Sequence, residues 1–391
     1  MIISKGSKIM SKRIFVDGSI NSELCIIAAD GQEINYFDYS DELANIKKNN
    51  IYLGIVSRVE PSLQAAFIEF GSEKKGFLPF DEIHPSYFKI PHEEKINLNE
   101  NSKNKDENDI KENKKNFLSL YRKYKIQDVI KKDQVLLIQI VKEERGTKGA
   151  AMTSFISLPG RYSVLLPNNS STGGVSKKVS NQLDRKRLKN LHDNFNLPEG
   201  MSLIIRTNAI SAEDEDIIAD FKYLRKLWTK IREDTLKSKA PILITELDTP
   251  IIKIARDFNQ RMIDEIIFSD LKTMKLYKKL ERDFSVKSEK KISHYKEKLP
   301  LFENYGIRNP INSLTEENIY LKSGGYLVIN PTEALTSVDI NSGRSTSEKN
   351  IEITALNTNL EAAEEIFKQV QLRNIAGLIV IDFIDMSMNS N

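Results

Sequence analysis

Residues 51–80 read IYLGIVSRVEPSLQAAFIEFGSEKKGFLPF, three short apolar runs interrupted by Pro61 and Gly71. Downstream, QVLLIQIVKEE (134–144) and GAAMTSFISL (149–158) have the same character. Short runs rich in β-branched and aromatic residues, bounded by turn residues, are typical of strands. Five such strands predict a small closed barrel of the OB type.

The composition changes abruptly between the third and fourth of these strands. Residues 97–116 contain seven Asn, five Lys and five Asp or Glu, and only Leu98 and Ile110 are apolar. Such a segment cannot bury enough apolar surface to offset the entropy of ordering it. We therefore predict a disordered insertion in the barrel.

Strand and helix patterns continue on both sides of the barrel. Residues 13–37 predict three antiparallel strands, with hairpin turns at Asp17-Gly18 and Asp30-Gly31. Residues 161–251 predict mixed strands and helices, and residues 251–315 predict a largely helical region with one strand.

The C-terminal part predicts a strand–turn–strand, a helix and a last strand. GLIVIDF (377–383) is a continuous apolar run, typical of a strand buried on both faces. Residues 352–373 predict a helix that packs through one apolar face, formed by Leu356, Leu360, Ala363, Phe367 and Val370.

Composition limits the class of protein. The 391 residues allow two to four domains, and 40% hydrophobic with 29% charged residues is typical of a folded chain. No window approaches 18 consecutive apolar residues, and the first ten lack a signal-peptide core, so we expect no transmembrane segment and a cytoplasmic location. The net charge of +3 is too balanced to indicate nucleic-acid binding without local patches.

The reactive residue types point to carboxylate chemistry. Cys25 is the single cysteine and lies in an apolar run, so it predicts an inert buried thiol and excludes an internal disulfide or a cysteine-based zinc site. The four histidines are scattered, with no HxxxH spacing. Any catalysis is therefore expected to depend on aspartate or glutamate.

The most distinctive carboxylates are Asp339 in SVDIN and Asp382 in LIVIDF, each within an apolar strand context. An isolated buried carboxylate is costly, so these residues are expected to hold a cation or lie at a strand end. A strand–helix–strand unit can bring both to one Mg²⁺, which activates water and neutralises phosphodiester charge. Asn341 faces the same side as Asp339 and can orient water or phosphate. Alternatively, Asp339 only caps a turn and Asp382 only ends a strand.

Two further groups predict contacts with nucleic acid. Phe67 and Phe77, near Arg145 and Lys148, predict stacking of unpaired bases on the barrel, unless the two rings belong to its core. Arg206-Thr207, at the end of a strand, predicts a phosphate clamp that the loop containing Lys177 closes over. The alternative is that Arg206 is an ordinary surface arginine.

Taken together, these segments closely resemble the ribonuclease E/G family of bacterial endoribonucleases. The resemblance extends over nearly the whole chain and is weakest in the first dozen residues, the Asn/Lys-rich insertion and roughly 210–300. The segments that carry it are IYLGIVSRVEPSLQAAFIEFGSEKKGFLPF, VKEERGTKGAAMTSFISLPGRY, LPEGMSLIIRT, SGGYLVINPTEALTSVDINSG and NTNLEAAEEIFKQVQLRNIAGLIVIDFIDM.

The resemblance implies an α+β multidomain architecture. An RNase H-like subdomain is expected to contain an inserted S1 (OB-fold) β-barrel and a 5′-sensor, and a partial DNase I-like α/β catalytic subdomain is expected to follow. The implied segments are 10–45 and 252–314 for the two RNase H-like parts, 46–160 for the S1 domain, 161–251 for the 5′-sensor and 315–391 for the DNase I-like subdomain.

The resemblance also implies residue roles. Asp339 and Asp382 match the family's magnesium ligands, and Asn341 matches the asparagine that supports the attack. Phe67, Phe77 and Lys148 match its single-strand-binding positions, with Arg145 nearby. Its pocket for a 5′-monophosphate implies the set Arg206, Thr207, Gly160, Val164 and Lys177, in which lysine keeps the charge of the family's arginine but loses the bidentate fork.

The implied function is magnesium-dependent cleavage of single-stranded A/U-rich RNA in mRNA decay and in rRNA and tRNA processing. Peripheral association with the inner membrane is a further family property. The CPxC zinc link and the dimerisation region that follow in the family are absent from this sequence, so neither zinc nor the family's homo-oligomer is expected, nor is a DNA partner. The alternative is a truncated RNA-binding fragment without catalysis, because the residues that support the site also lie further along the family's sequences.

Overall fold

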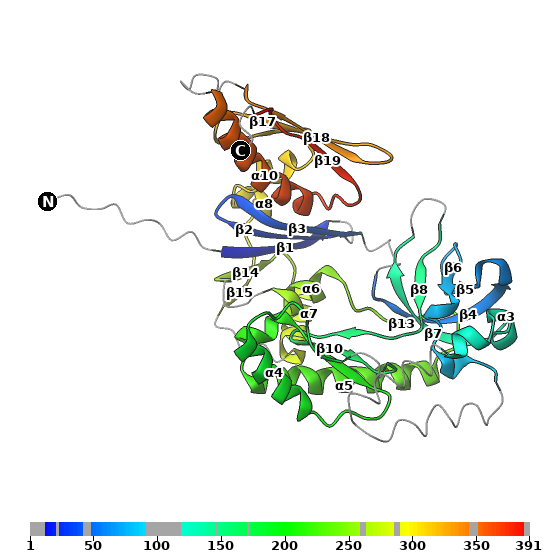
Figure 1. Ribbon diagram of the computed structural model, residues 1–391. Helices are drawn as coiled ribbons and strands as arrows, with labels where there is room; N and C mark the ends of the chain where they lie inside the picture. The colour runs from blue at the N-terminus through cyan, green and yellow to red at the C-terminus, as the bar shows by residue number, and fades with distance from the viewer. Residues whose placement is uncertain are drawn as a thin grey trace. The chain divides into compact units, whose positions relative to one another are not determined.

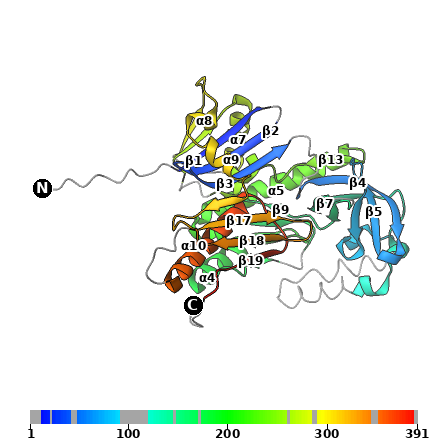
Figure 2. The same ribbon diagram turned by 90° about the horizontal axis from the view of Figure 1, so that it is seen from above.

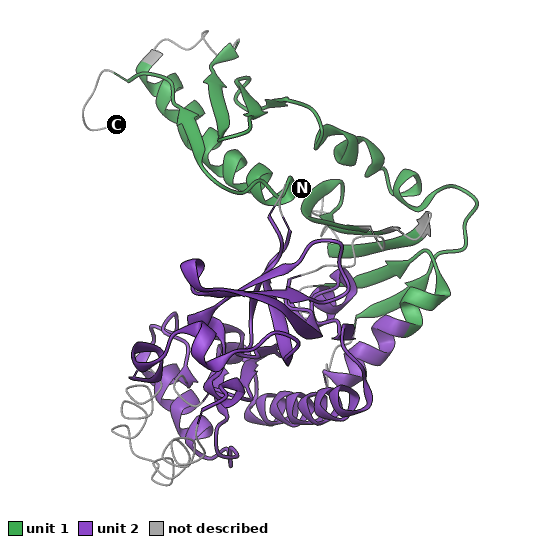
Figure 3. Cartoon of the chain, turned by 90° about the vertical axis from the view of Figure 1, so that its right-hand side faces the viewer, with its two compact units in different colours: residues 1–42, 259–275, 288–391 green, residues 43–258, 276–287 purple. Residues whose placement is uncertain are grey.

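The computed structural model describes residues 12–20, 23–41, 48–90, 119–144, 148–169, 173–258, 263–284, 290–343 and 351–386. The predicted insertion at 97–116 lies outside these ranges. Contacts divide the chain into two compact units (Figure 3). Unit 1 comprises residues 1–42, 259–275 and 288–391, and unit 2 comprises residues 43–258 and 276–287. Both contain helices and sheets, so the mixed α and β class is confirmed.

Unit 1 begins with a five-stranded sheet in the order β15-β14-β1-β2-β3 (Figure 1). Strands β1 (Lys12–Ile20), β2 (Glu23–Asp30) and β3 (Glu33–Asp41) are antiparallel. Strands β14 (Glu265–Phe268) and β15 (Lys291–His294) are parallel and extend the sheet beyond β1. Helices α8 (Leu301–Asn304) and α9 (Arg308–Ser313) contribute to the core on one face, while α7 (Leu271–Asp283) follows β14.

Two predictions for this sheet are wrong. Asp17-Gly18 is not a hairpin turn but lies within β1, where the register with β2 shifts between Asp17 and Ile20 as in a β-bulge. A Cβ atom at Gly18 would lie 2.8 Å from Oδ2 of Asp270, so close approach explains this glycine. The region 251–315 contains a second strand, β15, in addition to the one predicted. The spacing did not predict β15 because the other strands of its sheet, apart from β14, come from the N-terminal part of the chain.

The second sheet of unit 1 has the order β16-β17-β18-β19. Strands β16 (Asn318–Tyr320), β17 (Tyr326–Pro331) and β18 (Thr336–Asn341) are antiparallel, and β19 (Ile379–Asp382) is parallel to β18. Helix α10 (Ile351–Leu372) links β18 to β19 and packs against one face of the sheet (Figure 2). Among the described residues, α10 covers one face of the run 377–383 and Val380 is 48% exposed, which corrects the prediction of burial on both faces.

Helix α10 packs largely through a different face from the one predicted, although Val370 of the predicted set does contact the core beneath the sheet. Its buried residues include Ala355, Thr358, Ala362 and Ile366, whereas Leu360 and Phe367 are 60% and 68% exposed. The helix carries apolar residues on both sides, so the spacing of apolar residues alone selects the wrong one.

Unit 2 contains the predicted barrel, which is closed and five-stranded. Its strands are β4 (Ile51–Glu60), β5 (Ala65–Glu69), β6 (Gly76–Pro79), β8 (Ala151–Thr153) and β7 (Val135–Lys142), and closure comes from the pairing of β7 with β4. Strand β13 (Ile242–Thr245) also pairs with β4, and the short helix α3 (Ile126–Val129) packs on the barrel core. Alternate residues such as Ala66, Ile68 and Leu78 fill that core.

The rest of unit 2 contains, in the described residues, a four-stranded sheet, the helices that pack on it and the C-terminal part of α7. Its strand order is β11-β12-β10-β9, from β9 (Leu158–Pro159), β10 (Ser163–Leu166), β11 (Gly174–Val175) and β12 (Ser202–Ile205). Helices α4 (Gln182–Asp193) and α5 (Asp214–Lys237) pack against these strands, and α6 (Pro250–Asp257) ends the segment. This arrangement positions the ends of β10 and β12 next to the end of α6.

Candidate functional site

Two carboxylates lie side by side on the second sheet of unit 1. Asp339 on β18 is directly opposite Asp382 on β19 in the parallel register. Residues that are opposite one another in a sheet project from the same face, and both aspartates are exposed. Their neighbours on β18, Val338 and Ile340, are buried on the side of α10. The alternation of apolar and polar residues along β18 therefore leaves the carboxylates on the uncovered face.

Two asparagines hold the carboxylate pair in place. Nδ2 of Asn341 donates a hydrogen bond to Oδ2 of Asp339 at 2.8 Å, so the third predicted residue is part of the same group. The buried Asn359 of α10 donates from Nδ2 to the Ile384 carbonyl at 2.9 Å and accepts from the Ile384 N–H at 3.0 Å. These bonds fix the chain two residues after Asp382. No pattern in the sequence marks Asn359.

The donor set fits a magnesium ion by its chemistry. Paired carboxylate oxygens on an open face are hard ligands that leave positions for water, as Mg²⁺ requires. Among the residues that the structure describes, no group of three or more His, Cys, Asp or Glu side chains forms a denser metal site. Asp385 is also exposed but follows β19 and is outside the paired register.

The barrel brings Phe67 and Phe77 together on its outer side. They are opposite one another on β5 and β6, with ring centroids 5.9 Å apart and planes at 70°. Both are half-buried and lie outside the barrel core, and the guanidinium of Arg58 is 4.2 Å from the centre of the Phe67 ring. Lys148 is exposed before β8, and Arg145 lies outside the described residues. The rings are thus placed where an unpaired base can stack.

The other predicted group gathers around Arg206, which directly follows β12. Its Nη1 donates to the Gly160 carbonyl at 2.6 Å and to Oδ1 of Asp257 at 2.8 Å. Val164 pairs with Ile204 of β12, and Thr207 opens the short 3₁₀ helix Thr207–Ser211.

Lys177 reaches the same end of the sheet. The N–H of the preceding residue, Ser176, donates to the Ile205 carbonyl at 2.9 Å, and Lys177 itself is exposed. The structure thus brings Lys177 to the strand end that carries Arg206.

Two buried residues of unit 2 are parts of this region that the sequence did not reveal. Arg256 is only 7% exposed and holds Oδ2 of Asp257 at 2.7 Å. Asp220 accepts hydrogen bonds from the N–H groups of Arg161, Tyr162 and Ser163 at 2.9–3.0 Å and from the Ser163 hydroxyl at 2.8 Å. Burial raises the pKa of Asp220, although these bonds oppose the shift. An Asp within a charged helix is unremarkable in sequence, so no pattern marked it.

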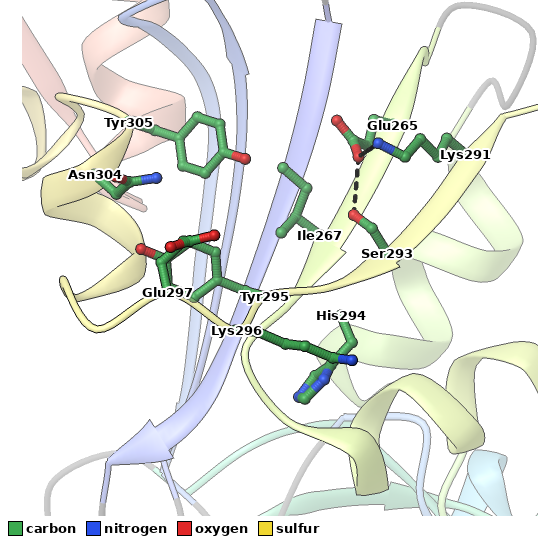
Figure 4. Close-up of a pocket in the computed structure, with 10 residues that line it drawn as sticks. All are labelled: Glu265, Ile267, Lys291, Ser293, His294, Tyr295, Lys296, Glu297, Asn304 and Tyr305. Carbon is green, nitrogen blue, oxygen red and sulfur yellow. Dashed lines mark hydrogen bonds and ion pairs between the residues drawn. The ribbon is translucent and has the colours of Figure 1, made fainter.

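A separate hollow of about 470 Å³ lies on the five-stranded sheet of unit 1 (Figure 4). Glu265 at its wall accepts from Lys291 at 2.9 Å and from the Ser293 hydroxyl at 2.8 Å. Burial alone would raise the pKa of Glu265, but these two partners lower it. The predicted site residues do not line this hollow.

Cys25 is a free, half-buried thiol. Burial, with the negative charges of Asp17 and Asp38, raises its pKa to about 12. It remains protonated at neutral pH and is therefore inert as a nucleophile. No helix in the described ranges is long and apolar enough to span a membrane.

The fold and site define a multidomain α+β protein that combines a closed five-stranded barrel with a sheet bearing paired carboxylates. The profile of the Ribonuclease E/G family matches residues 157–391. Ribonuclease E of Escherichia coli K12 is 40% identical over 381 residues, 96% of this chain and 33% of that protein. A putative ribonuclease E of Buchnera aphidicola subsp. Baizongia pistaciae is 38% identical over 96% of this chain and 86% of its own length.

Ribonuclease G of Salmonella typhimurium is 35% identical over 86% of this chain and 64% of that protein. The chain therefore belongs to the ribonuclease E/G family. It spans between 33% and 39% of the length of several ribonuclease E relatives, from Buchnera, Escherichia and Haemophilus.

Proposed function

We propose that this chain is an endoribonuclease of the ribonuclease E/G type. Its substrate is single-stranded A/U-rich RNA, cleaved with magnesium during mRNA decay and the processing of rRNA and tRNA. The observation that carries the proposal is the register of Asp339 and Asp382, side by side on an exposed face in a member of this family.

Asp339 and Asp382 are the residues that would hold magnesium, which when bound supplies charge neutralisation and activation of water. Asn341 orients the Asp339 carboxylate through its 2.8 Å hydrogen bond. Asn359 fixes the chain after Asp382, so the two carboxylates stay in register. Both carboxylates are exposed among the described residues, so a phosphodiester has access to them.

The preference for single strands follows from the barrel. A base must be unstacked from its neighbours before it can lie against Phe67 or Phe77. Arg58 beside Phe67, with Lys148 and Arg145, supplies positive charge for the phosphates of the bound strand.

We propose that Arg206 and Thr207, with the backbone around Gly160 and Val164 and the side chain of Lys177, bind a 5′-monophosphate. Arginine is suited to this task because its planar donors match phosphate oxygens. We also assign the subdomains as RNase H-like (10–45 and 252–314), S1 (46–160), 5′-sensor (161–251) and DNase I-like (315–391).

The test is cleavage of a 5′-monophosphorylated A/U-rich RNA by this chain, with magnesium and with EDTA. Internal cuts are expected with magnesium only, and Asp339→Asn and Asp382→Asn are each expected to remove them while RNA binding persists. Asp385→Asn is the matched control, because it removes a nearby exposed carboxylate outside the register and is expected to retain cleavage.

Cleavage that survives in Asp339→Asn or Asp382→Asn would contradict the assigned site. Binding without cleavage by the unaltered chain would instead identify it as a non-catalytic RNA-binding protein.

A further inference from the structure

Arg206 presents only part of its guanidinium to a ligand. Within the described part of the chain, the guanidinium of Arg206 donates two hydrogen bonds, both from Nη1, to the Gly160 carbonyl and to Asp257. The side chain is 30% exposed. An arginine anchored through one nitrogen keeps its other N–H donors in a fixed plane, which is the arrangement that favours two parallel bonds to a phosphate.

Asp257 is itself held in place by Arg256. Nε and Nη2 of Arg256 both donate to its Oδ2, at 2.9 and 2.7 Å, while its Oδ1 holds Arg206. Arg256 is fixed in turn by Oδ1 of Asp248 at 2.8 Å and by the Leu247 carbonyl at 3.0 Å. Burial alone would raise the pKa of Asp257, but the bonds and charge of Arg256, and then of Arg206, lower it. Asp257 therefore stays ionised at neutral pH.

The second anchor of Arg206 is equally well fixed. Asp220 organises the loop that follows Gly160 by accepting from three successive backbone N–H groups. A Cβ atom at Gly160 would lie 2.6 Å from both carboxylate oxygens of Asp220, so only glycine fits between the loop and this carboxylate. The Gly160 carbonyl thus occupies a set position when it accepts from Arg206.

We propose that Asp257 is a positioning residue for recognition of the 5′-phosphate: it aims Arg206 and is kept in place by Arg256. This inference rests on the proposed sensor role of Arg206. The positive charge of Arg256 offsets the negative charge of the Asp257 carboxylate. Arg206 therefore keeps its attraction for a phosphate even though it is ion-paired. The Arg256–Asp257 pair thereby sets how strongly the enzyme prefers a 5′-monophosphate.

The experiment compares kcat/KM for two RNAs of one sequence, with 5′-monophosphate and with 5′-hydroxyl ends. Asp257→Asn is expected to reduce the ratio of the two values about tenfold, because one charge-assisted hydrogen bond on Arg206 is weakened. Asp257→Glu, which retains the charge, is expected to restore most of the ratio. Asp214→Asn is the matched control: it removes an arginine-paired carboxylate of the same unit, 2.6 Å from Arg187, without touching Arg206 or its two anchors, and the ratio is expected to stay near that of the unaltered chain.

Each outcome decides between two causes. If Asp257→Asn lowers kcat/KM for both RNAs by the same factor, the ratio does not change and Asp257 supports only the fold. That result, or an unchanged kcat/KM for both RNAs, overturns the inference. Thermal melting of each variant shows whether unfolding contributes. If Arg206→Ala leaves the ratio intact, the sensor assignment itself fails, whatever Asp257 does.

Discussion

On β5, Phe67 faces out of the barrel while its neighbours Ala66 and Ile68 are fully buried. Its ring has Phe77 on one side and the Arg58 guanidinium over its face. A ring of this kind can stack a base without a large change in the barrel core. The RNA binding proposed for this ring is therefore expected to be separable from its contribution to stability.

We expect Phe67→Ala to weaken binding of single-stranded RNA by about 1–3 kcal/mol, the usual value of one base–aromatic stack. Fluorescence anisotropy with a labelled A/U-rich strand measures this. Phe70→Leu is the control, since Phe70 is 1% exposed in the same barrel and its loss is expected to lower stability rather than affinity. An unchanged Kd for Phe67→Ala would mean that RNA does not stack on this ring.

At the scale of the element, the two faces of helix α10 differ in burial. Ile366 is 4% exposed in the core beneath the second sheet of unit 1, whereas the adjacent Phe367 is 68% exposed. Ile366→Ala is expected to lower the free energy of unfolding by about 2–5 kcal/mol. Phe367→Ala is expected to change it by no more than about 0.5 kcal/mol. Urea unfolding checks the pair, and the reverse order would mean that the helix packs as the sequence pattern predicted.

The elements that the sequence predicted well are those with local rules. The barrel strands alternate between core and surface and end at turn residues, so Ile68 and Leu78 can be assigned from the sequence. Strand β15 was not predicted, because it pairs with β14 in a sheet that is completed by β1, more than two hundred residues away. The packing face of α10 could not be predicted from the sequence, because the buried polar residues Thr358 and Asn359 share it with small apolar residues.

The candidate site shows the same division. Asp339 and Asp382 were identifiable as charges within apolar strands, but their direct opposition depends on a strand register that spacing does not give. Asp257 was not identifiable, because an Arg-Asp pair at the end of a helix is common and its meaning depends on Arg206, fifty-one residues earlier.

At the scale of the whole molecule, stability is expected to fall in acid in two stages. Burial lowers the pKa of His84 from 6.5 to about 4. The unfolded chain takes up this proton first, so the contribution of neutral His84 is complete above pH 6.5 and is lost as the pH falls toward 4. Below that window the carboxylates with lowered pKa values lose their contribution to stability as they become protonated; they are Glu33, Asp257, Glu265 and Glu361.

The first stage is the testable one. Between pH 7.5 and pH 5 we expect a loss of about 2 kcal/mol in the free energy of unfolding from His84. Urea titrations at the two pH values measure it, and His84→Gln should reduce the difference between them. An equal difference in the variant would assign the acid sensitivity to other groups.

The order of strands in the five-stranded sheet has a consequence for synthesis. Strands β1–β3 leave the ribosome first, but β14 and β15 follow only after residue 263. At about 5–20 residues per second, the first three strands wait roughly 10–50 s for their neighbours. During that interval β1 offers an unpaired row of N–H and C=O groups, the kind of edge on which nascent chains aggregate. We therefore expect this edge to need protection by a chaperone while translation continues.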